Sequence, residues 1–429
     1  MVAELNNGNT KDPNIDHGEE LVDLGTTTKE TRDPTNPEEA PMKWSHSWDF
    51  TLSALGYVIG FGNILRFPYL AYKNGGGTFL IPYAIMLFLI GLPLFFIEVI
   101  IGQYNNKGPT KAFKRMAPVM KGVGYAMLFV TCSIGVCFNV LIAWAVRYWF
   151  SGMASDIPWL DKETNLTTDY KNWATVKYFD NTIGLGDGNL NSSEFSGMKW
   201  EIVGCLFASC MIVCACCILG VRSIGKVVYF TVPFPYVVLV IMFIWSLTLD
   251  GSAKGIEYFF VPDDPKKLWN PYTWSVAASQ VLYSLSIGAG GLASLSIHND
   301  FNTDCLKTSV IICIVDSLTS IFAGFIVFAV LGNISHSLGH NTRADFNQMM
   351  RHNETKGYWE GPGLAYIAYP MALHSLPQGV PQLWSFLFFL MLITLGLDSA
   401  FVFVDTISTA MEENFNCVRR NNRDVPLRM

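Results

Sequence analysis

Several carboxylates stand inside long apolar stretches of this 429-residue chain, among them Glu98, Asp316 and Asp398. A carboxylate in such surroundings is costly unless it coordinates a cation, carries protons or binds other polar groups. Ser399 follows Asp398 directly, and Asn63 places an amide in another apolar stretch. Carboxylate, hydroxyl and amide oxygens are the ligands that hard cations prefer. These residues therefore predict ion coordination in an apolar medium, although Glu98 could equally brace the end of a helix.

The glycine-rich segments 56–63 and 284–291 supply a second kind of ligand. Glycines at this density, beside Asn63 and Ser284, predict that the helix unwinds, which frees backbone carbonyls for cations and N–H groups for anions. Close packing of helices through small residues is the alternative explanation for one such segment. Two of them, five apolar stretches apart, are typical of a secondary transporter built from inverted repeats.

Eight apolar stretches must position these residues, and each is long enough to cross about 30 Å of hydrocarbon as a helix. Only 15% of the residues are charged, against roughly 25% in soluble domains, and 51% are hydrophobic. The alternation of a membrane β-barrel is absent. We therefore predict an all-α polytopic membrane protein. The stretches lie near 50–72, 79–103, 123–150, 200–219, 227–248, 273–297, 307–332 and 382–411.

Other function classes find little support. The sequence shows no nucleophile with a base, no metal-binding triad and no phosphate-binding loop, which argues against an enzyme. No basic stripe suggests nucleic acid, so the expected partners are the lipid bilayer and a small solute. The first 42 residues contain ten acidic and three basic residues and few apolar ones, which predicts a disordered tail.

Lysines and arginines follow the second, fourth and eighth stretches, and these sides are predicted to be cytoplasmic, as are both termini. The long loops 151–199 and 333–381 then face outward. They carry acceptor sequons for N-glycosylation at Asn165, Asn191 and Asn353, while that at Asn333 lies close to the membrane. We expect a multi-pass protein of the plasma membrane.

Several motifs give the chain a specific resemblance. The motifs are Gly62-Asn-Ile-Leu-Arg66-Phe-Pro-Tyr69, Lys73-Asn-Gly-Gly-Gly-Thr-Phe-Leu-Ile-Pro82-Tyr83, Gly102-Gln-Tyr104, Gly220-Val-Arg-Ser-Ile-Gly225, Gly361-Pro-Gly-Leu-Ala-Tyr-Ile-Ala-Tyr-Pro370 and Phe389-Leu-Met-Leu-Ile-Thr-Leu-Gly-Leu-Asp398-Ser399. In these motifs the chain resembles the neurotransmitter:sodium symporter family, and within it the amino-acid branch that includes glycine and proline transporters.

The resemblance implies two inverted five-helix repeats with broken first and sixth helices, followed by two more helices. This chain has eight predicted spans, so its second repeat is incomplete. The expected organisation is a disordered acidic cytoplasmic tail at 1–42, transmembrane helices 1–5 at 43–248, helices 6–8 at 249–415 and a short basic cytoplasmic tail at 416–429.

The function that the resemblance implies is sodium-coupled symport of a small amino acid or related zwitterion by alternating access. Gly60 supports this substrate class, because family members that carry monoamines have Asp at this position. The alternative is a truncated, non-transporting chain that associates with full-length family members. Either could form homo- or hetero-oligomers.

The resemblance also implies a set of site residues. Sodium ions would bind one group at Val58, Asn63, Ser284 and Asp316, and another at Gly56, Ile59, Leu395, Asp398 and Ser399. The substrate would contact Tyr57, Gly60, Phe61, Phe138, Tyr283, Ser284, Ser286 and Ala289. Chloride would bind Tyr83, Gln280, Ser284 and Ser320 beside Asp316, and the gate residues would be Arg66, Trp44 and Glu413.

Three positions depart from the family pattern. Phe138 replaces a tyrosine whose hydroxyl meets the substrate carboxylate, and that loss fits an unusual zwitterion such as a betaine or a chain that no longer transports. Asp316 replaces an asparagine, and its built-in negative charge casts doubt on a need for chloride. Pro41 replaces the arginine that latches the cytoplasmic gate against the acid at the position of Glu413, which predicts a leaky or inward-biased gate.

Overall fold

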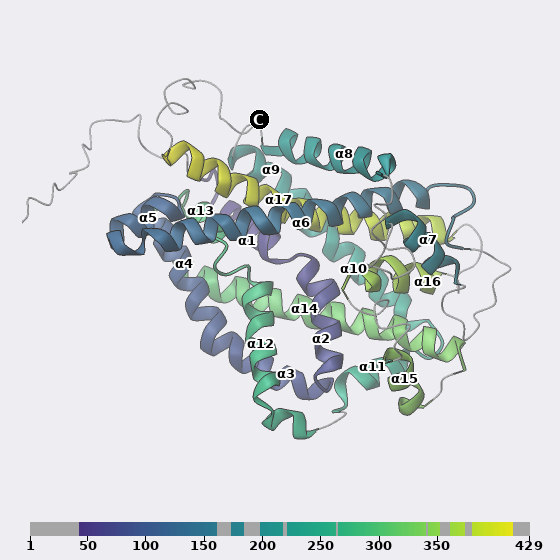
Figure 1. The fold of residues 1–429 in the computed structure, drawn as a ribbon. Coiled ribbons are helices and arrows are strands. Elements are labelled where there is room, and N and C mark those ends of the chain that lie inside the picture. The colour runs from purple at the N-terminus through teal and green to yellow at the C-terminus, as the bar shows by residue number, and fades with distance from the viewer. Residues whose placement is uncertain are drawn as a thin grey trace, which may run out of the picture. The chain divides into compact units, whose positions relative to one another are not determined.

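The computed structural model describes residues 43–160, 173–183, 198–217, 221–262, 265–339, 342–351, 361–373 and 380–414 (Figure 1). These residues are helical wherever they form regular structure, and no β-strand occurs among them. The predicted tails 1–42 and 416–429 lie outside the described residues, as do the sequons at Asn165, Asn191 and Asn353.

Seventeen α-helices occur among the described residues. In chain order they are α1 (Ser47–Val58), α2 (Phe67–Lys73), α3 (Gly77–Met86), α4 (Leu92–Asn105), α5 (Pro109–Met116), α6 (Lys121–Gly152), α7 (Ala174–Ile183), α8 (Trp200–Cys217), α9 (Val221–Thr231), α10 (Pro233–Leu247), α11 (Ser252–Phe260), α12 (Pro271–Ser284), α13 (Gly291–Ser296), α14 (Cys305–Ser337), α15 (Arg343–Arg351), α16 (Tyr369–Ala372) and α17 (Val380–Asn414). Stretches of π-helix join some of them at Gly62–Arg66, Leu87–Gly91 and Leu364–Ala368, and 3-10 turns lie at Pro118–Met120 and Pro265–Trp269.

Six helical segments among the described residues are long and apolar enough to cross a membrane, and a bent pair would make a seventh. The pair is Trp48–Val58 with Gly62–Lys73, which meet at 43°. The stretch predicted at 273–297 is present as the shorter helices α12 and α13. The predicted all-α membrane architecture is confirmed. The six segments are Gly77–Asn105, Pro118–Gly152, Trp200–Cys217, Ile224–Leu247, Cys305–Ser337 and Val380–Asn414.

The first span breaks where the sequence analysis predicted, between Val58 and Gly62. Glycine suits the positions beside this break because side chains from other elements approach its backbone closely. A Cβ atom at Gly56 would lie 2.8 Å from a methyl group of Val232, and one at Gly62 would lie 3.0 Å from the ring of Tyr283. The backbone of the first span thus lies against Val232, between α9 and α10, and against α12.

The sixth span breaks between the end of α12 and the start of α13. Ser286, Gly288 and Gly290 have φ angles of 52°, 84° and 79° in this segment. Left-handed backbone of this kind cannot continue an α-helix, and glycine adopts it at little cost. The glycine-rich sequence thus produces the predicted interruption.

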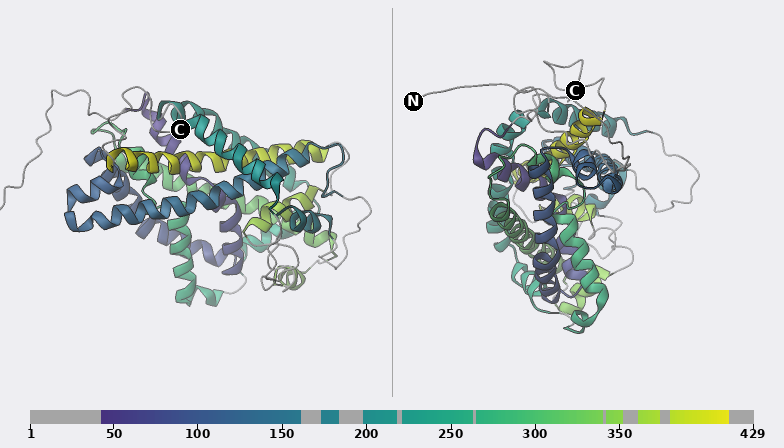
Figure 2. Two further views of the ribbon diagram at one scale, coloured as in Figure 1. Left: turned by 45° about the horizontal axis from the view of Figure 1, so that its top comes forward. Right: turned by 90° about the vertical axis from the view of Figure 1, so that its left-hand side faces the viewer.

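Helices α6 and α17 form the most extensive helix pair among the described residues and run side by side along most of their length (Figure 2). The two helices are 32 and 35 residues long. Residues of both face the two breaks, so this pair forms one wall of the region that the breaks create.

The predicted outer loop 333–381 contains more structure than the sequence analysis anticipated. Residues 364–372 form a helical segment that is buried throughout. Tyr366 stacks on Phe389 with ring centroids 6.1 Å apart, and its hydroxyl donates to the carbonyl of Leu141 at 2.9 Å. This part of the loop packs into the helix bundle between α6 and α17.

Candidate functional site

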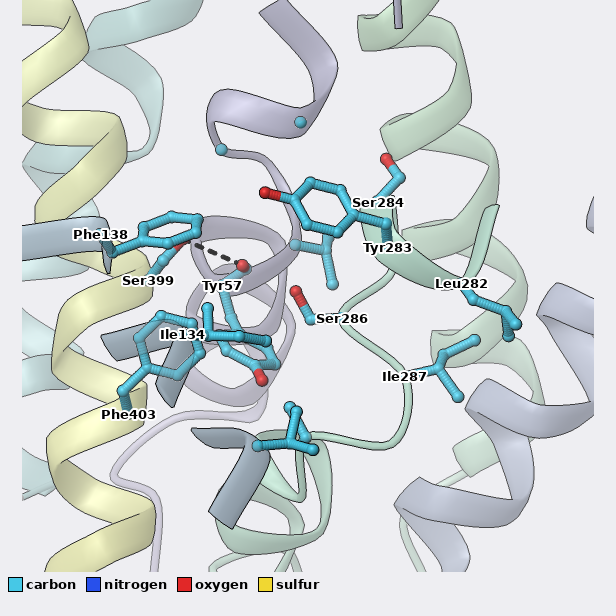
Figure 3. Close-up of a pocket in the computed structure, with 15 residues that line it drawn as sticks. Tyr57, Ile134, Phe138, Leu282, Tyr283, Ser284, Ser286, Ile287, Ser399 and Phe403 are labelled. Carbon is cyan, nitrogen blue, oxygen red and sulfur yellow. Dashed lines mark hydrogen bonds between the residues drawn. The ribbon is translucent and has the colours of Figure 1, made fainter. Parts of the chain in front are cut away.

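A cavity of about 240 Å³ lies between the two breaks, lined by the first span, α6, the α12–α13 segment and α17 (Figure 3). Nearly every predicted substrate residue lines it. Phe61 is the exception, because its ring packs behind that of Phe138 with centroids 5.4 Å apart. The predicted residues that line the cavity are Tyr57, Gly60, Phe138, Tyr283, Ser284, Ser286 and Ala289, together with Val58 and Ser399 from the sodium sets.

The sequence analysis missed several apolar residues of the lining, and helical spacing could have found some of them. Val130 and Ile134 precede Phe138 by eight and four residues on α6, so all three share one face. Phe403 follows Ser399 by four residues on α17 in the same way. Leu282 lies in the last turn of α12, and Ile287 lies in the break of the sixth span, where no regular period applies.

The first predicted sodium group is brought together from three elements. The Asn63 amide donates to Asp316 Oδ1 at 2.7 Å, to Ser320 Oγ at 2.9 Å and to Ser284 Oγ at 3.2 Å. Ser284 Oγ donates to Asp316 Oδ2 at 2.8 Å. All four side chains are at most 2% exposed. Val58, the remaining member, is also buried and lies at the end of α1.

The second predicted group meets where α17 passes the first break. Ser399 Oγ donates to the carbonyl of Tyr57 at 3.2 Å, and a Cβ atom at Gly56 would lie 3.1 Å from Asp398 Oδ2. The sequence analysis missed Thr231 on α9, whose hydroxyl donates to Asp398 Oδ1 at 2.5 Å. Buried Ile59 and Leu395 complete the group, with exposures of 3% each.

The predicted chloride residues surround Asp316. Ser284 and Ser320 both belong to the hydrogen-bonded cluster around its carboxylate and Asn63. The hydroxyl of Tyr83 donates to Ser317 Oγ at 3.4 Å, one residue along α14. Gln280 donates from its amide to the carbonyl of Gly62 at 3.4 Å. The hydroxyls and amide expected at a chloride site therefore adjoin a carboxylate of the protein.

Glu98 has a structural role in this molecule. Its carboxylate accepts the backbone N–H groups of Gly288 at 2.9 Å and Gly290 at 3.0 Å, both in the broken part of the sixth span. Thr131 of α6 donates to the carbonyl of Ala289 between them. Two intact helices thus bind backbone groups that the broken helix leaves without helical partners. The geometry favours the bracing alternative for Glu98.

The predicted gate residues lie in three separate places. The guanidinium of Arg66 lies over the ring of Tyr283, 4.4 Å from its centroid, and one of its nitrogens donates to Ser279 Oγ at 3.4 Å. Trp44 contacts His298 edge to face, with ring centroids 5.8 Å apart. Glu413 accepts the backbone N–H of Gly108 at 2.8 Å.

In the part of the chain that the structure describes, Glu413 accepts a hydrogen bond from Gly108 and none from the segment that begins at Lys43. Lys43 instead forms an ion pair with Asp300 at 3.8 Å and donates to the carbonyl of Asn299. Pro41 lies outside the described residues. The Glu413 carboxylate thus holds the turn before α5 in this conformation.

Comparisons with known proteins agree with this geometry. The chain matches the model of the sodium:neurotransmitter symporter family over residues 42–428. It is 37% identical to sodium- and chloride-dependent GABA transporter 2 of Mus musculus, over 89% of this chain and 64% of the relative. It is 39% identical to the sodium- and chloride-dependent neutral and basic amino acid transporter B(0+) of Homo sapiens, over 90% and 64%. The sodium- and chloride-dependent glycine transporter 1 of Xenopus laevis is 38% identical, over 87% and 63%.

The fold is shared with a solved transporter structure. The crystal structure of MhsT in complex with L-phenylalanine superposes with a TM-score of 0.70 at 22% identity, over 88% of this chain and 76% of that chain. This likeness confirms the predicted fold with its broken first and sixth helices. The chain spans between 62% and 64% of the length of the mouse, human and frog relatives.

Proposed function

This chain belongs to the sodium:neurotransmitter symporter family, and we propose that it couples sodium to the movement of a small amino acid or related zwitterion by alternating access. One observation carries the proposal. Two clusters of buried oxygen-bearing side chains flank a single cavity at the breaks of two helices. Ions and substrate bound there would touch the same unwound backbone, so that binding of each would favour the other.

The sodium ions would be held mostly by groups of this chain. Asn63, Ser284 and Asp316 supply side-chain oxygens for the first ion, and the Val58 carbonyl would complete it. Asp398 and Ser399 serve the second ion with the carbonyls of Gly56, Ile59 and Leu395. Each cluster contains a carboxylate, which offsets the charge of one cation in a medium where an unpaired charge is costly.

The substrate would occupy the cavity beside Gly60. A Cβ atom at this glycine would lie 3.2 Å from Ser399 Oγ and 3.9 Å from the ring of Phe138. A larger side chain would therefore project into the space between the two sodium groups. Its absence leaves that space for a solute of the size of an amino acid, in keeping with the 240 Å³ of the cavity.

Chloride is proposed to be dispensable. The Asp316 carboxylate already lies among the hydroxyl and amide groups that would hold the anion. The Asp316 carboxylate would repel a chloride ion there. Its own negative charge already balances that of the first sodium ion.

The experiment that tests the proposed function is uptake of radiolabelled glycine, proline, GABA, betaine and neutral amino acids by cells expressing the full chain. Surface biotinylation measures the protein at the plasma membrane. We expect saturable uptake that disappears when the sodium in the buffer is replaced by potassium. Surface-exposed protein without sodium-dependent uptake of any of these solutes would contradict the proposal.

A second candidate is a non-transporting chain that associates with longer family members. The chain spans 62–64% of the length of these relatives. Co-expression with a tagged transporter of this family distinguishes the two. Co-purification with altered uptake by the partner, and none by this chain alone, would support association.

The proposed location is the plasma membrane, with both ends of the chain in the cytoplasm. The lysines and arginines that follow the second, fourth and eighth stretches support this orientation. Epitope tags at the two ends should be reached by antibodies only after the cells are permeabilised.

A further inference from the structure

Thr231, the last residue of α9, binds the carboxylate of the second predicted sodium group. Its hydroxyl donates to Asp398 Oδ1 at 2.5 Å, a length typical of hydrogen bonds to an ionised oxygen. Thr231 is 5% exposed and Asp398 is 3% exposed, so bulk water does not compete for the contact. Within the described part of the chain, no second group donates a hydrogen bond to this carboxylate. The orientation of Asp398 therefore depends on one hydroxyl from another helix.

The two oxygens of the Asp398 carboxylate face different elements. Oδ1 faces α9 through Thr231, whereas Oδ2 lies 3.1 Å from the position of a Cβ atom at Gly56. The backbone of Gly56 belongs to the same predicted sodium group. A carboxylate that is held at one oxygen keeps the other near that backbone, and it loses less rotational freedom when it binds a cation. The hydrogen bond thus orients the carboxylate in advance for an ion beside Gly56.

The chain around Thr231 is itself fastened to the first span. A methyl group of Val232, which follows α9, lies 2.8 Å from the position of a Cβ atom at Gly56. Tyr229 donates its hydroxyl to Asp49 Oδ1 on α1 at 2.8 Å. This end of α9 therefore contacts both α1 and α17, which fixes the Thr231 hydroxyl relative to both parts of the sodium group.

A hydroxyl that serves only helix packing is the alternative explanation for Thr231. Threonine in membrane helices commonly donates to a carbonyl four residues earlier in its own helix. Thr231 makes this contact too, with the carbonyl of Val227 at 3.2 Å, but its contact with Asp398 is the shorter of the two. Thr406 on α17 provides a contrast, because its hydroxyl donates to the carbonyl of Val402 at 2.8 Å and contacts no carboxylate among the described residues.

We propose that Thr231 is a positioning residue for the second sodium ion, which acts by holding Asp398 Oδ1 so that Oδ2 stays turned to the backbone of the first break. This inference rests on the proposed function and adds α9 to the elements that determine the affinity for sodium.

The test is binding of radiolabelled sodium to the purified full chain in detergent. Thr231→Val keeps the shape of the side chain and removes the hydroxyl, so it should raise the dissociation constant of one sodium ion by about tenfold. Asp398→Asn should weaken or abolish binding of the same ion. Thr231→Ser retains the hydroxyl and should stay within about twofold of the unaltered chain.

Thr406→Val is the matched control. It makes the same chemical change on the helix that carries Asp398, and Thr406 is 1% exposed, so it is as buried as Thr231. This variant should leave the affinity for sodium unchanged. Thr231→Ala also lacks the hydroxyl and carries the same expectation as Thr231→Val if the valine variant does not fold.

The other outcomes overturn the inference in ways that can be told apart. An unchanged affinity for sodium with a lowered melting temperature in sodium-free buffer would show that Thr231 serves packing alone, and the proposed function would stand. An equal loss of affinity in the serine and valine variants would show that the hydroxyl is not the cause. If the unaltered chain binds no sodium, the inference and the proposed function both fail.

Discussion

Asp316 is the residue whose chemistry departs furthest from what the family resemblance implies. Its carboxylate accepts hydrogen bonds from Asn63 and Ser284 and is fully buried. We predict that Asp316→Asn makes sodium-dependent binding or uptake require chloride, because the negative charge must then come from the solvent. Replacing chloride by gluconate measures this, and the unaltered chain should be insensitive to the exchange.

Asp304→Asn is the control for that experiment. Asp304 is exposed at the N-terminus of the same helix, where it accepts the N–H of Lys307 at 3.0 Å. The Asp304→Asn substitution also removes one negative charge, but at a position away from the site. It should therefore leave the response to chloride unchanged. Loss of activity by the unaltered chain in gluconate would contradict the role given to Asp316.

At the scale of single residues, the sequence predicted which residues form the site better than it predicted their hydrogen-bond partners. Asp398 and Ser399 were recognisable because polar residues are rare in apolar stretches. Thr231 was not, since threonine is common in membrane helices and its partner Asp398 lies 167 residues away. Only the packing of α9 against α17 brings the two together.

The broken sixth span depends on a side chain from another element. Glu98 accepts two backbone N–H groups of the segment between α12 and α13. We predict that Glu98→Gln lowers the free energy of unfolding by about 2 kcal/mol, because the amide replaces one acceptor oxygen by a donor that faces an N–H group. Thermal unfolding of the purified chain in detergent measures the change.

Glu257→Gln serves as the comparison, since Glu257 is exposed on α11. It should alter the melting temperature by less than the Glu98 variant. An unchanged melting temperature for Glu98→Gln would mean that water or other groups satisfy the broken segment.

Two glycines provide a matched test of helix packing. A Cβ atom at Gly255 would lie 2.0 Å from the carbonyl oxygen of Phe328, so α11 and α14 could not keep their present contact. We predict that Gly255→Ala destabilises the protein by about 3 kcal/mol. Gly204→Ala on α8 should be neutral or stabilise by about 0.5–1 kcal/mol, because nothing lies within 4 Å of the added carbon. Equal melting temperatures for the two variants would contradict the close contact.

Both breaks were predictable from glycine spacing, whereas the buried segment 364–372 was not. Its nine residues are too few to span a membrane, and an isolated sequence does not reveal which surface will cover them. The stacking of Tyr366 on Phe389 and its hydrogen bond to Leu141 depend on how α6 and α17 are placed.

For the whole molecule, the order of the spans predicts which sequons reach the glycosylation machinery. Asn333 is 5% exposed within α14, where its amide donates to the carbonyl of Asp250 at 3.0 Å. We predict that it stays unmodified while Asn165, Asn191 and Asn353 carry glycans. Digestion with an N-glycosidase and single Asn→Gln variants measure this by gel mobility. A shift lost in Asn333→Gln would place the end of α14 differently.

The contact between Glu98 and Gly288 joins residues 190 positions apart. The conformation of the segment between α12 and α13 thus depends partly on the Glu98 side chain of α4. A substitution in either place therefore affects the other. A substitution at position 98 would survive selection only beside a compensating change near 288–290. Among descendants of a common ancestor, these positions should therefore vary together or not at all.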